Sequence, residues 1–232
     1  MIKLYVMNLD NNEIFNDILN YKHQVSNDRK EKINKLKFTN DKSISILSEL
    51  LMRYCIFDNY DIRSEEISFR TNEFGKPYLK SFQNIFFNVT HSEHYIVCAI
   101  SDSEIGIDIE LVSKDDCNFM NRILHPQELG WIDELNQFEK NNTYYKFWCL
   151  KEAFGKCLGV GLNYDTKGTY FSYENHNWNL KETSFKVNYE YHFCIIDSIK
   201  DYIMAICSPK NINIERIDLT VETLLKAFMI EK

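Results

Sequence analysis

Proline and glycine are scarce in this chain of 232 residues, which contains three prolines and seven glycines. Because flexible linkers are usually rich in such residues, the scarcity argues against long interdomain linkers. The sequence also lacks any run of 18 apolar residues, which a membrane-spanning helix needs. Its first apolar run ends at Asn8 and is too short for the core of a signal peptide. We therefore expect neither a membrane span nor a secretion signal.

An excess of positive charge is absent as well, since the formal net charge is −7 at pH 7. This charge argues against generic binding to nucleic acid or to anionic membranes, although a local basic pocket for a small phosphorylated ligand remains compatible with it. The seven cysteines are odd in number and form no C-x-x-C pair. Free thiols in a reducing cytoplasm are therefore the expected state.

Hydrophobic residues make up 44% of the chain and aromatic residues 14%, which is enough for a sizeable core. Hydrophobic periodicity and turn residues predict the secondary structure. Strands are expected at 2–8, 85–89, 95–100, 106–112 and 202–207, with a tight turn at 74–77 and one or two hairpins within 168–196. Helices are expected at 42–57, 117–124, 126–137, 142–158 and 219–230.

Two segments resemble each other, YIVCAIS at 95–101 and YIMAICS at 202–208. Each follows a hairpin-like region that itself follows a helix. Chance can produce two such strands of small and aliphatic residues. A duplication would instead mean two α+β halves with a cleft between them, where ligands commonly bind. The two segments alone leave both interpretations open.

The stretch GIDIE at 106–110 places Asp108 and Glu110 within an otherwise apolar run. Side chains alternate along a strand, so the two carboxylates share one face, about 6–7 Å apart. Mg²⁺ prefers such oxygen ligands together with phosphate oxygens and water. The alternative is an ordinary strand with a solvated acidic face, and this pair taken alone favours that alternative.

A second cluster lies in FWCLKEAFGK at 147–156. On a helix, Trp148, Glu152 and Lys156 lie one above another at i, i+4 and i+8. The alternative is a surface Glu–Lys pair that contributes a few tenths of a kcal/mol. However, Gly155 weakens a helix interior, and three glycines fall between residues 155 and 161. These glycines indicate that backbone segments approach one another closely.

Basic residues are scattered in the first half of the chain, at Arg29, Lys32, Lys76 and His91, and each could simply be solvated. A hydrolytic role for His91 beside Ser92 is improbable, because neighbours on a strand point to opposite faces and no positioned aspartate follows from the sequence.

Taken together, the motifs resemble a known family. GKPYL, FFNVTHSEHYIVCAIS, GIDIE and FWCLKEAFGKCLGVGL occur in the order and at roughly the spacing found in 4′-phosphopantetheinyl transferases. The resemblance is to the longer, Sfp-like type that activates peptide and polyketide synthases, and it extends from about residue 2 to about residue 208. Each motif alone is unspecific, whereas the combination is highly specific.

The resemblance implies an α+β fold built as a pseudo-two-fold duplication, with the active site in the cleft between the halves. The expected halves are 1–105 and 106–232, in a cytoplasmic monomer. Coenzyme A would be the co-substrate and Mg²⁺, or Mn²⁺ in its place, the cofactor. By the resemblance, the metal ligands would be Asp108, Glu110 and Glu152, and Lys156 would contact the pyrophosphate. The other residues expected to contact coenzyme A are Arg29, Lys32, Ser45, Lys76, Thr90 and His91.

The implied reaction is attack of a carrier-protein serine on the β-phosphorus of coenzyme A, with release of 3′,5′-ADP. Asp108, Glu152 and Lys156 are the expected catalytic residues, since the anionic pyrophosphate needs its charge neutralised and its partners aligned. A base must accept the serine proton. Glu152, acting directly or through a metal-bound water, and Glu128 in HPQEL are the two candidates.

The apo acyl or peptidyl carrier protein of such enzymes serves peptide, polyketide or fatty acid biosynthesis and is usually acidic. Because this chain is acidic too, contact must come from a local patch. A helix just after GIDIE could form an apolar groove for a helix of the carrier. Ordinary core packing of that helix is the alternative. The residues in question are Phe119, Met120, Ile123 and Leu124.

Two other functions compete with the transferase. A metal-dependent nuclease also uses acidic clusters, but it predicts a basic groove that the net charge of −7 does not favour. A silent protein that binds coenzyme A or carriers would be expected to have lost a carboxylate, and all three are present.

Overall fold

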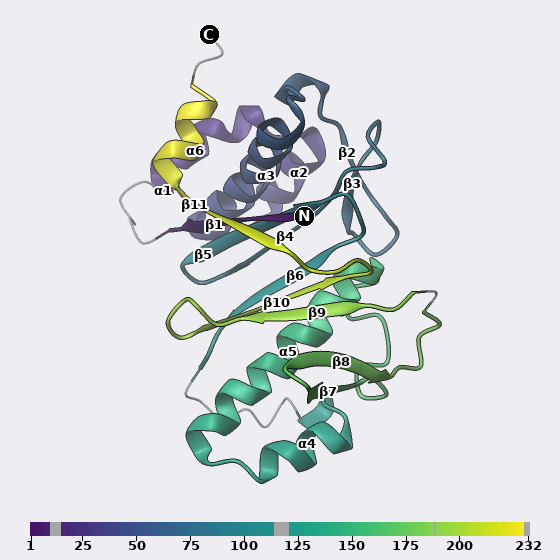
Figure 1. Cartoon of the computed structure of the whole chain (residues 1–232). Helices are drawn as coiled ribbons and strands as arrows, with labels where there is room; N and C mark the ends of the chain where they lie inside the picture. Colours follow the sequence, from purple (N-terminus) through teal and green to yellow (C-terminus); the bar gives the residue numbers. More distant parts are fainter. Residues whose placement is uncertain (10–14, 114–120, 188, 230–232) are drawn as a thin grey trace.

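The structure is a computed structural model that describes residues 1–9, 15–113, 121–187 and 189–229 (Figure 1). Its first sheet has the strand order β11-β1-β5-β4. The strands are β1 (Ile2–Asn8), β4 (Phe86–Ser92), β5 (Tyr95–Ser101) and β11 (Ile214–Thr220). Short strands β2 (Phe69–Thr71) and β3 (Pro77–Leu79) form a separate hairpin. The helices of this part are α1 (Phe15–Ile18), α2 (Asn27–Lys35), α3 (Thr39–Tyr60) and α6 (Val221–Ala227), with 3-10 turns η2 (Leu19–Gln24) and η3 (Ser64–Glu66).

The second sheet has the order β6-β10-β9-β8-β7. Its strands are β6 (Gly106–Leu111), β7 (Tyr170–Glu174), β8 (Asn177–Glu182), β9 (His192–Ile196) and β10 (Tyr202–Ser208). Helices α4 (Pro126–Asp133) and α5 (Gln137–Leu158) precede β7 in the chain. No helix of the described part of the chain combines the length and apolar character needed to cross a bilayer.

The duplication implied by the family resemblance is present in the topology. One unit runs β1, α3, β4, β5 with strand order β1-β5-β4, and the other runs β6, α5, β9, β10 with strand order β6-β10-β9. All four pairings within these units are antiparallel. The similar segments are the central strands β5 and β10 of the two units. The fold is therefore the α+β duplication that the sequence predicted.

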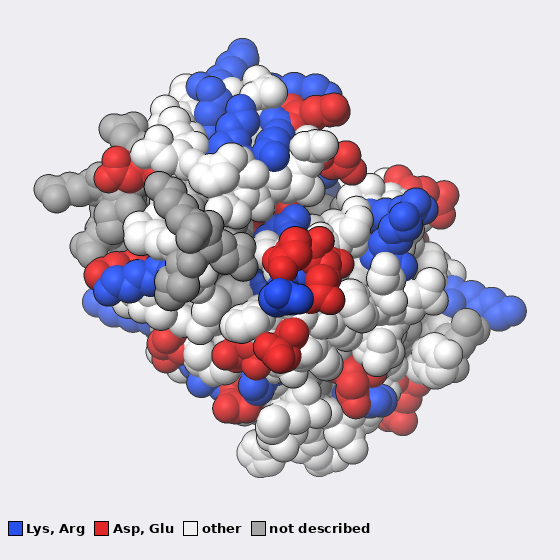
Figure 2. Space-filling view, turned by 90° about the horizontal axis from the view of Figure 1, so that it is seen from above, with Lys and Arg blue, Asp and Glu red and all other residues white. Residues whose placement is uncertain are grey.

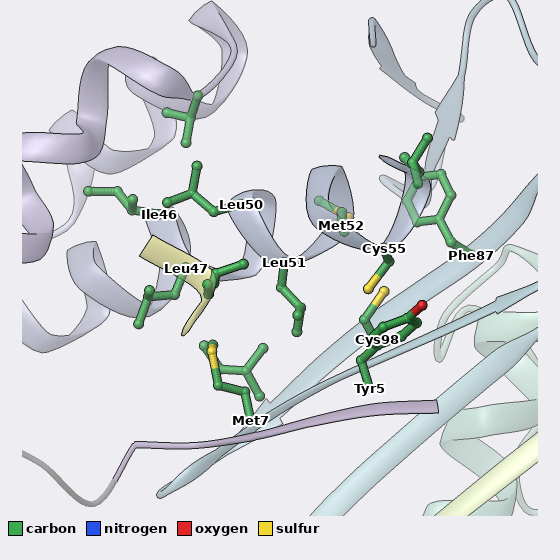
Figure 3. Packing of buried hydrophobic residues seen from close by; sticks show 14 of the residues in the cluster. Tyr5, Met7, Ile46, Leu47, Leu50, Leu51, Met52, Cys55, Phe87 and Cys98 are labelled. Carbon is green, nitrogen blue, oxygen red and sulfur yellow. The ribbon is translucent and has the colours of Figure 1, made fainter. Parts of the chain in front are cut away.

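Three apolar clusters hold the layers together. The first lies between the first sheet and its helices, where α3 packs over Tyr5, Met7 and Cys98 (Figure 3). The second lies between the second sheet and α5. The third joins the two sheets through residues of β1, β5, β6 and β10, and includes Ile107 and Ile109. The six cysteines that the structure describes are free thiols.

The two halves also meet along β4 and β6, which lie side by side. The Asn88 side chain accepts a hydrogen bond from the Ile107 amide at 2.9 Å, and the Ser92 hydroxyl accepts one from the Leu111 amide at 3.1 Å. Side chains of β4 therefore satisfy backbone donors at the edge of β6, which would otherwise be unpaired. This seam aligns Thr90 of one half with the carboxylates of the other.

The end of the chain packs with the N-terminal half. Strand β11 pairs in parallel with β1, and α6 buries Val221, Leu224 and Leu225 in the first apolar cluster. Residues 214–227 thus pack with the N-terminal half. Strand β11 was also missed in the sequence, where only a helix at 219–230 was expected.

Another expected helix, at 117–124, falls largely outside the described residues, since 114–120 are not described. Residues 121–124 are described and are not α-helical. Helix α5 begins five residues earlier than expected, at Gln137, and ends at Leu158 as predicted.

Gly106 generates a prediction about the contact between β6 and α5. A Cβ added at Gly106 would overlap the Ala153 carbonyl oxygen and the Cys157 amide nitrogen, both backbone atoms of α5. Gly106→Ala should therefore force the helix away from the strand and lower the free energy of unfolding by about 1–3 kcal/mol or more. Urea denaturation measures this loss.

The matched control is Gly130→Ala in α4, where an added Cβ has no neighbour within 4 Å. This substitution should leave stability unchanged or raise it by up to about 1 kcal/mol, because alanine is the better helix former. Equal stabilities for the two variants would contradict the close packing of α5 on β6.

Candidate active site

An ion pair between Asp108 and Lys156 lies at the centre of the predicted site. Because Ile107 and Ile109 point into the layer between the sheets, Asp108 points the other way, towards α5. The Lys156 ammonium donates to Asp108 Oδ1 at 2.6 Å. Asp108 is only 2% exposed, and its second oxygen, Oδ2, is buried without a hydrogen-bond partner among the described residues. Burial disfavours the charged form of Lys156, but attraction to Asp108 outweighs it and raises the lysine pKa.

The remaining carboxylates lie on either side of this pair. The Trp148 indole nitrogen donates to Glu110 Oε1 at 3.0 Å, and the Ser92 hydroxyl donates to Oε2 at 3.4 Å. Glu152 Oε2 lies 3.9 Å from Lys156 Nζ. Trp148, Glu152 and Lys156, which are spaced at i, i+4 and i+8 on α5, therefore all face β6, the strand that carries Asp108 and Glu110. The structure brings the two predicted clusters together.

Three carboxylates share a single ammonium in this cluster, and their pKa values respond to that excess. Burial raises the pKa of Glu110, and the nearby charge of Asp108 raises it further. The pKa of Glu152 is raised to about 7, mainly by burial, while Lys156 opposes the shift and Asp108 and Glu110 add to it. The cluster thus holds uncompensated negative charge and favours an additional cation.

The oxygen atoms of the acidic cluster are the candidate ligands for a metal ion. Within the residues that the structure describes, no group of three His, Cys, Asp or Glu side chains is close enough to hold a metal ion as arranged. Lys156 occupies one oxygen of Asp108, and Trp148 and Ser92 occupy both oxygens of Glu110. The unpartnered Oδ2 of Asp108 is nevertheless a hard oxygen donor in an anionic setting, which suits Mg²⁺.

A pocket of about 530 Å³ adjoins the carboxylates. It is lined by α2, the first turns of α3, the hairpin of β2 and β3, and the end of β4. Five of the residues predicted to contact coenzyme A line this one pocket: Arg29, Lys32, Ser45, Thr90 and His91. The first and last of these residues, Arg29 and His91, are 62 positions apart in the chain and yet line the same cavity.

Thr90 connects the pocket to the acidic cluster. Its hydroxyl donates to Asp108 Oδ1 at 3.3 Å and accepts from Lys156 at 3.2 Å, and the same residue lines the pocket. Thr90 therefore links the lining of the pocket to Lys156 and Asp108.

Arg29 is held in place by a buried carboxylate that was not among the predicted site residues. Glu49, which is 1% exposed, accepts hydrogen bonds from Arg29 Nε at 3.3 Å and from the Ser26 amide at 2.7 Å. Arg53 donates to the same carboxylate at 2.8 Å. The only sequence signal was the i, i+4 spacing of Glu49 and Arg53, which usually marks an exposed pair.

Positive charge is concentrated locally despite the net charge of −7. Figure 2 views the molecule from the side of the N-terminal helices and shows Lys and Arg side chains gathered at one edge. Helix α2 alone carries Arg29, Lys30, Lys32 and Lys35. His91 is exposed, and its pKa is lowered first by partial desolvation and then by Lys156.

Lys76 does not join the other five residues in the pocket. Its ammonium donates to Glu104 at 3.0 Å and to the carbonyl oxygens of Ile105 and Cys157 at 3.2 Å each. It lines a separate pocket of about 300 Å³. In this arrangement Lys76 ties the β2–β3 hairpin to the C-terminal end of α5.

Glu128 is not a suitable base, contrary to the alternative drawn from the sequence. It is fully buried and forms an ion pair with the fully buried Lys151 at 2.9 Å. It also accepts hydrogen bonds from the backbone amides of His125 at 2.8 Å and Phe171 at 2.9 Å. A carboxylate that is satisfied in this way and closed off from solvent cannot reach a substrate. Its contacts instead join α4, α5 and β7.

The prediction of an apolar groove after GIDIE is wrong for one of its four residues. Leu124 is fully buried in the second apolar cluster, so it belongs to the core and cannot line a groove. Ile123 is half-buried, while Phe119 and Met120 lie outside the described residues.

Comparisons with known proteins identify the family of the chain. A family model described as the 4′-phosphopantetheinyl transferase superfamily matches residues 104–207. A second model, described as 4′-phosphopantetheinyl transferase, N-terminal, matches residues 14–103. The two matches adjoin, and together they cover both duplicated units except strand β1. The chain belongs to the 4′-phosphopantetheinyl transferase superfamily, and its relatives are of the Sfp-like type.

The relatives include the 4′-phosphopantetheinyl transferase gsp of Aneurinibacillus migulanus, 33% identical over 65% of this chain and 63% of that protein. Sfp of Bacillus subtilis (strain 168) is 29% identical over 60% of this chain and 62% of that protein. These matches thus span less than two thirds of either relative. The transferase psf-1 of Bacillus pumilus is 29% identical over 94% of this chain and 93% of that protein. A solved holo-(acyl-carrier-protein) synthase from Bacillus anthracis, in complex with CoA, aligns with 22% identity and a TM-score of 0.40 over 45% of this chain and 93% of that one.

The buried pair of Lys151 and Glu128 generates a stability prediction. Lys151→Met should leave Glu128 buried without its counter-charge and lower the free energy of unfolding by about 3–5 kcal/mol. Replacing both residues, as Lys151→Met with Glu128→Leu, should recover part of this loss because no buried charge remains, although the backbone amides of His125 and Phe171 lose their acceptor. Urea denaturation measures all three proteins.

The control is Lys226→Met, which breaks the exposed pair with Glu222 and should have no measurable effect. A double variant as unstable as Lys151→Met alone would contradict the assignment of the loss to an unpaired buried charge.

Proposed function

We propose that this protein transfers the 4′-phosphopantetheine group from coenzyme A to a serine hydroxyl of an apo acyl or peptidyl carrier protein. The observation that carries the proposal is the position of Thr90, which lines the basic pocket and also contacts Asp108 and Lys156. A phosphate-binding pocket and an acidic, lysine-bearing cluster are thereby joined through one side chain. Membership in the superfamily supports the same reaction.

The pocket suits the phosphoadenosine end of coenzyme A. Arg29 and Lys32 supply permanent positive charge, and Ser45, Thr90 and His91 supply further donors. Because Glu49 fixes the Arg29 guanidinium, that charge is preorganised and little side-chain entropy is lost on binding. His91 would face the ribose 3′-phosphate, whose charge favours the protonated imidazole.

The pyrophosphate would then lie against Lys156. The serine oxygen forms a bond to the β-phosphorus while the bond from that phosphorus to the bridging oxygen breaks, and 3′,5′-ADP leaves with the negative charge. Lys156 stabilises this charge, which is the main task of a protein in phosphoryl transfer. Glu152, whose side chain is 15% exposed, would take the serine proton, since Glu128 is closed off.

Asp108, Glu110 and Glu152 would hold Mg²⁺, or Mn²⁺ in its place. When bound, the ion would neutralise charge on the phosphates. Asp108 Oδ2 supports this assignment because it is buried and lacks a partner among the described residues.

The carrier protein would approach the cleft from solvent, and its serine would enter beside Glu152. One chain supplies both the pocket and the carboxylates, which supports a monomer as the active form. The free cysteines among the described residues support the expected cytoplasmic location.

Mass spectrometry of an apo-carrier incubated with the protein, coenzyme A and Mg²⁺ tests the proposal. We expect a 4′-phosphopantetheine adduct with the native chain and none with Asp108→Ala, because the latter removes the partner of Lys156 and a proposed metal ligand. Asp218→Ala, on the exposed face of β11, is the control and should retain the adduct.

Absence of an adduct on every apo-carrier tried would contradict the transferase, and cleavage of DNA would favour the nuclease alternative. Retention of full activity by Asp108→Ala would contradict the central role of the Asp108–Lys156 pair.

A variant of Arg29 separates the binding of coenzyme A from the transfer reaction. Arg29→Gln should raise the KM for coenzyme A roughly tenfold or more, the usual effect of losing a charged hydrogen bond. The kcat should change little, because Arg29 lies in the pocket and not in the acidic cluster. Lys35→Gln, on the same helix but outside the pocket lining, should leave both constants unchanged. Equal effects of the two variants would point to general electrostatics instead of a specific contact.

A further inference from the structure

The pocket of about 530 Å³ contains one residue that its basic character does not explain. Asp41, in the first turn of α3, lines the cavity together with Arg29, Lys32 and His91. It is the only carboxylate among the described residues that line this pocket. Its side chain is exposed and has no hydrogen bond or ion pair within the described part of the chain.

The other polar groups of the pocket suit phosphate. Lysine and arginine side chains can only donate, and the Ser45 hydroxyl lies 3.5 Å from an Arg29 nitrogen. The Ser48 hydroxyl donates to the Ile44 carbonyl oxygen at 2.7 Å. An ionised carboxylate, by contrast, can only accept, and it repels phosphate oxygens. A ligand that fills the pocket would therefore match Asp41 with a part that offers a hydrogen-bond donor.

The phosphoadenosine end of coenzyme A offers such donors only on its nucleoside. These are the exocyclic amine of adenine and the 2′-hydroxyl of the ribose, whereas its phosphates present acceptors alone. We propose that Asp41 accepts a hydrogen bond from the adenosine of coenzyme A and so selects the nucleoside, while the neighbouring cations bind the phosphates. This inference rests on the proposed function, because it takes coenzyme A as the ligand of the pocket.

Two other roles for Asp41 predict different results in binding measurements. Acidic residues in the first turn of a helix interact favourably with its dipole, so Asp41 could serve helix stability alone. Asp41 also counters the desolvation and the Lys156 charge that lower the pKa of His91, so it could act on the 3′-phosphate through that imidazole. Variants and ligand analogues separate these roles.

Titration calorimetry of the full chain with coenzyme A measures the contact without any carrier protein. Asp41→Ala should raise the Kd for coenzyme A roughly tenfold, as expected for a lost hydrogen bond to a charged group. Asp41→Asn should recover part of the affinity, because the amide oxygen still accepts. Glu222→Ala, an acid in the first turn of α6, is the matched control and should bind as the native chain does.

Two analogues identify the donor. One carries hypoxanthine in place of adenine and lacks the amine, and the other carries 2′-deoxyribose and lacks the hydroxyl. The difference between the native chain and Asp41→Ala should vanish for one analogue and persist for the other. Dephospho-coenzyme A, which lacks the 3′-phosphate, should retain the difference.

Three results would overturn the inference. They are an unchanged Kd for coenzyme A in Asp41→Ala, a loss that persists with both analogues, and a loss that vanishes with dephospho-coenzyme A. The last result would assign the effect to His91. A native chain that binds coenzyme A and depends on Asp41, but modifies no carrier, would contradict the proposed function and support the nucleoside contact.

Discussion

The ion pair between Lys156 and Asp108 joins α5 to β6, and the arrangement of the site depends on it. Its 2.6 Å contact forms because Gly106 lets the helix backbone approach the strand, and because the isoleucines on either side of Asp108 anchor the opposite face of β6. The same ammonium contacts Thr90 across the seam between the halves. One lysine thus connects the helix, the acidic strand and the neighbouring half.

The duplication explains why the site lies where the two units meet. Each unit has a long helix on three antiparallel strands, but the two have different chemical tasks. The first carries the basic pocket on α2, α3 and β4, and the second carries the carboxylates on β6 and α5. Neither unit alone places a phosphate-binding surface beside acidic residues. The contact between β4 and β6 therefore creates the site.

Strong periodicity made several elements predictable. Strands β1, β5, β6 and β10 and the end of α5 lie within a residue or two of their expected positions, because each has a sustained apolar pattern. Strand β11 was missed because exposed polar residues dominate it and its partner, β1, lies some 200 residues away in the chain. Glu128 and Leu124 were misassigned because burial, which sequence spacing does not reveal, decides their roles.

Local backbone geometry makes it predictable which nearby residues can act together. Alternation along a strand puts Asp108 and Glu110 on one face, and helical spacing aligns Glu152 with Lys156, since both patterns follow from backbone geometry. Which distant segments of the chain meet depends on tertiary packing. It placed Asp41 in the basic pocket and Lys76 outside it. Such placements depend on how whole layers pack, and apolar packing is not directional and leaves no local signature in the chain.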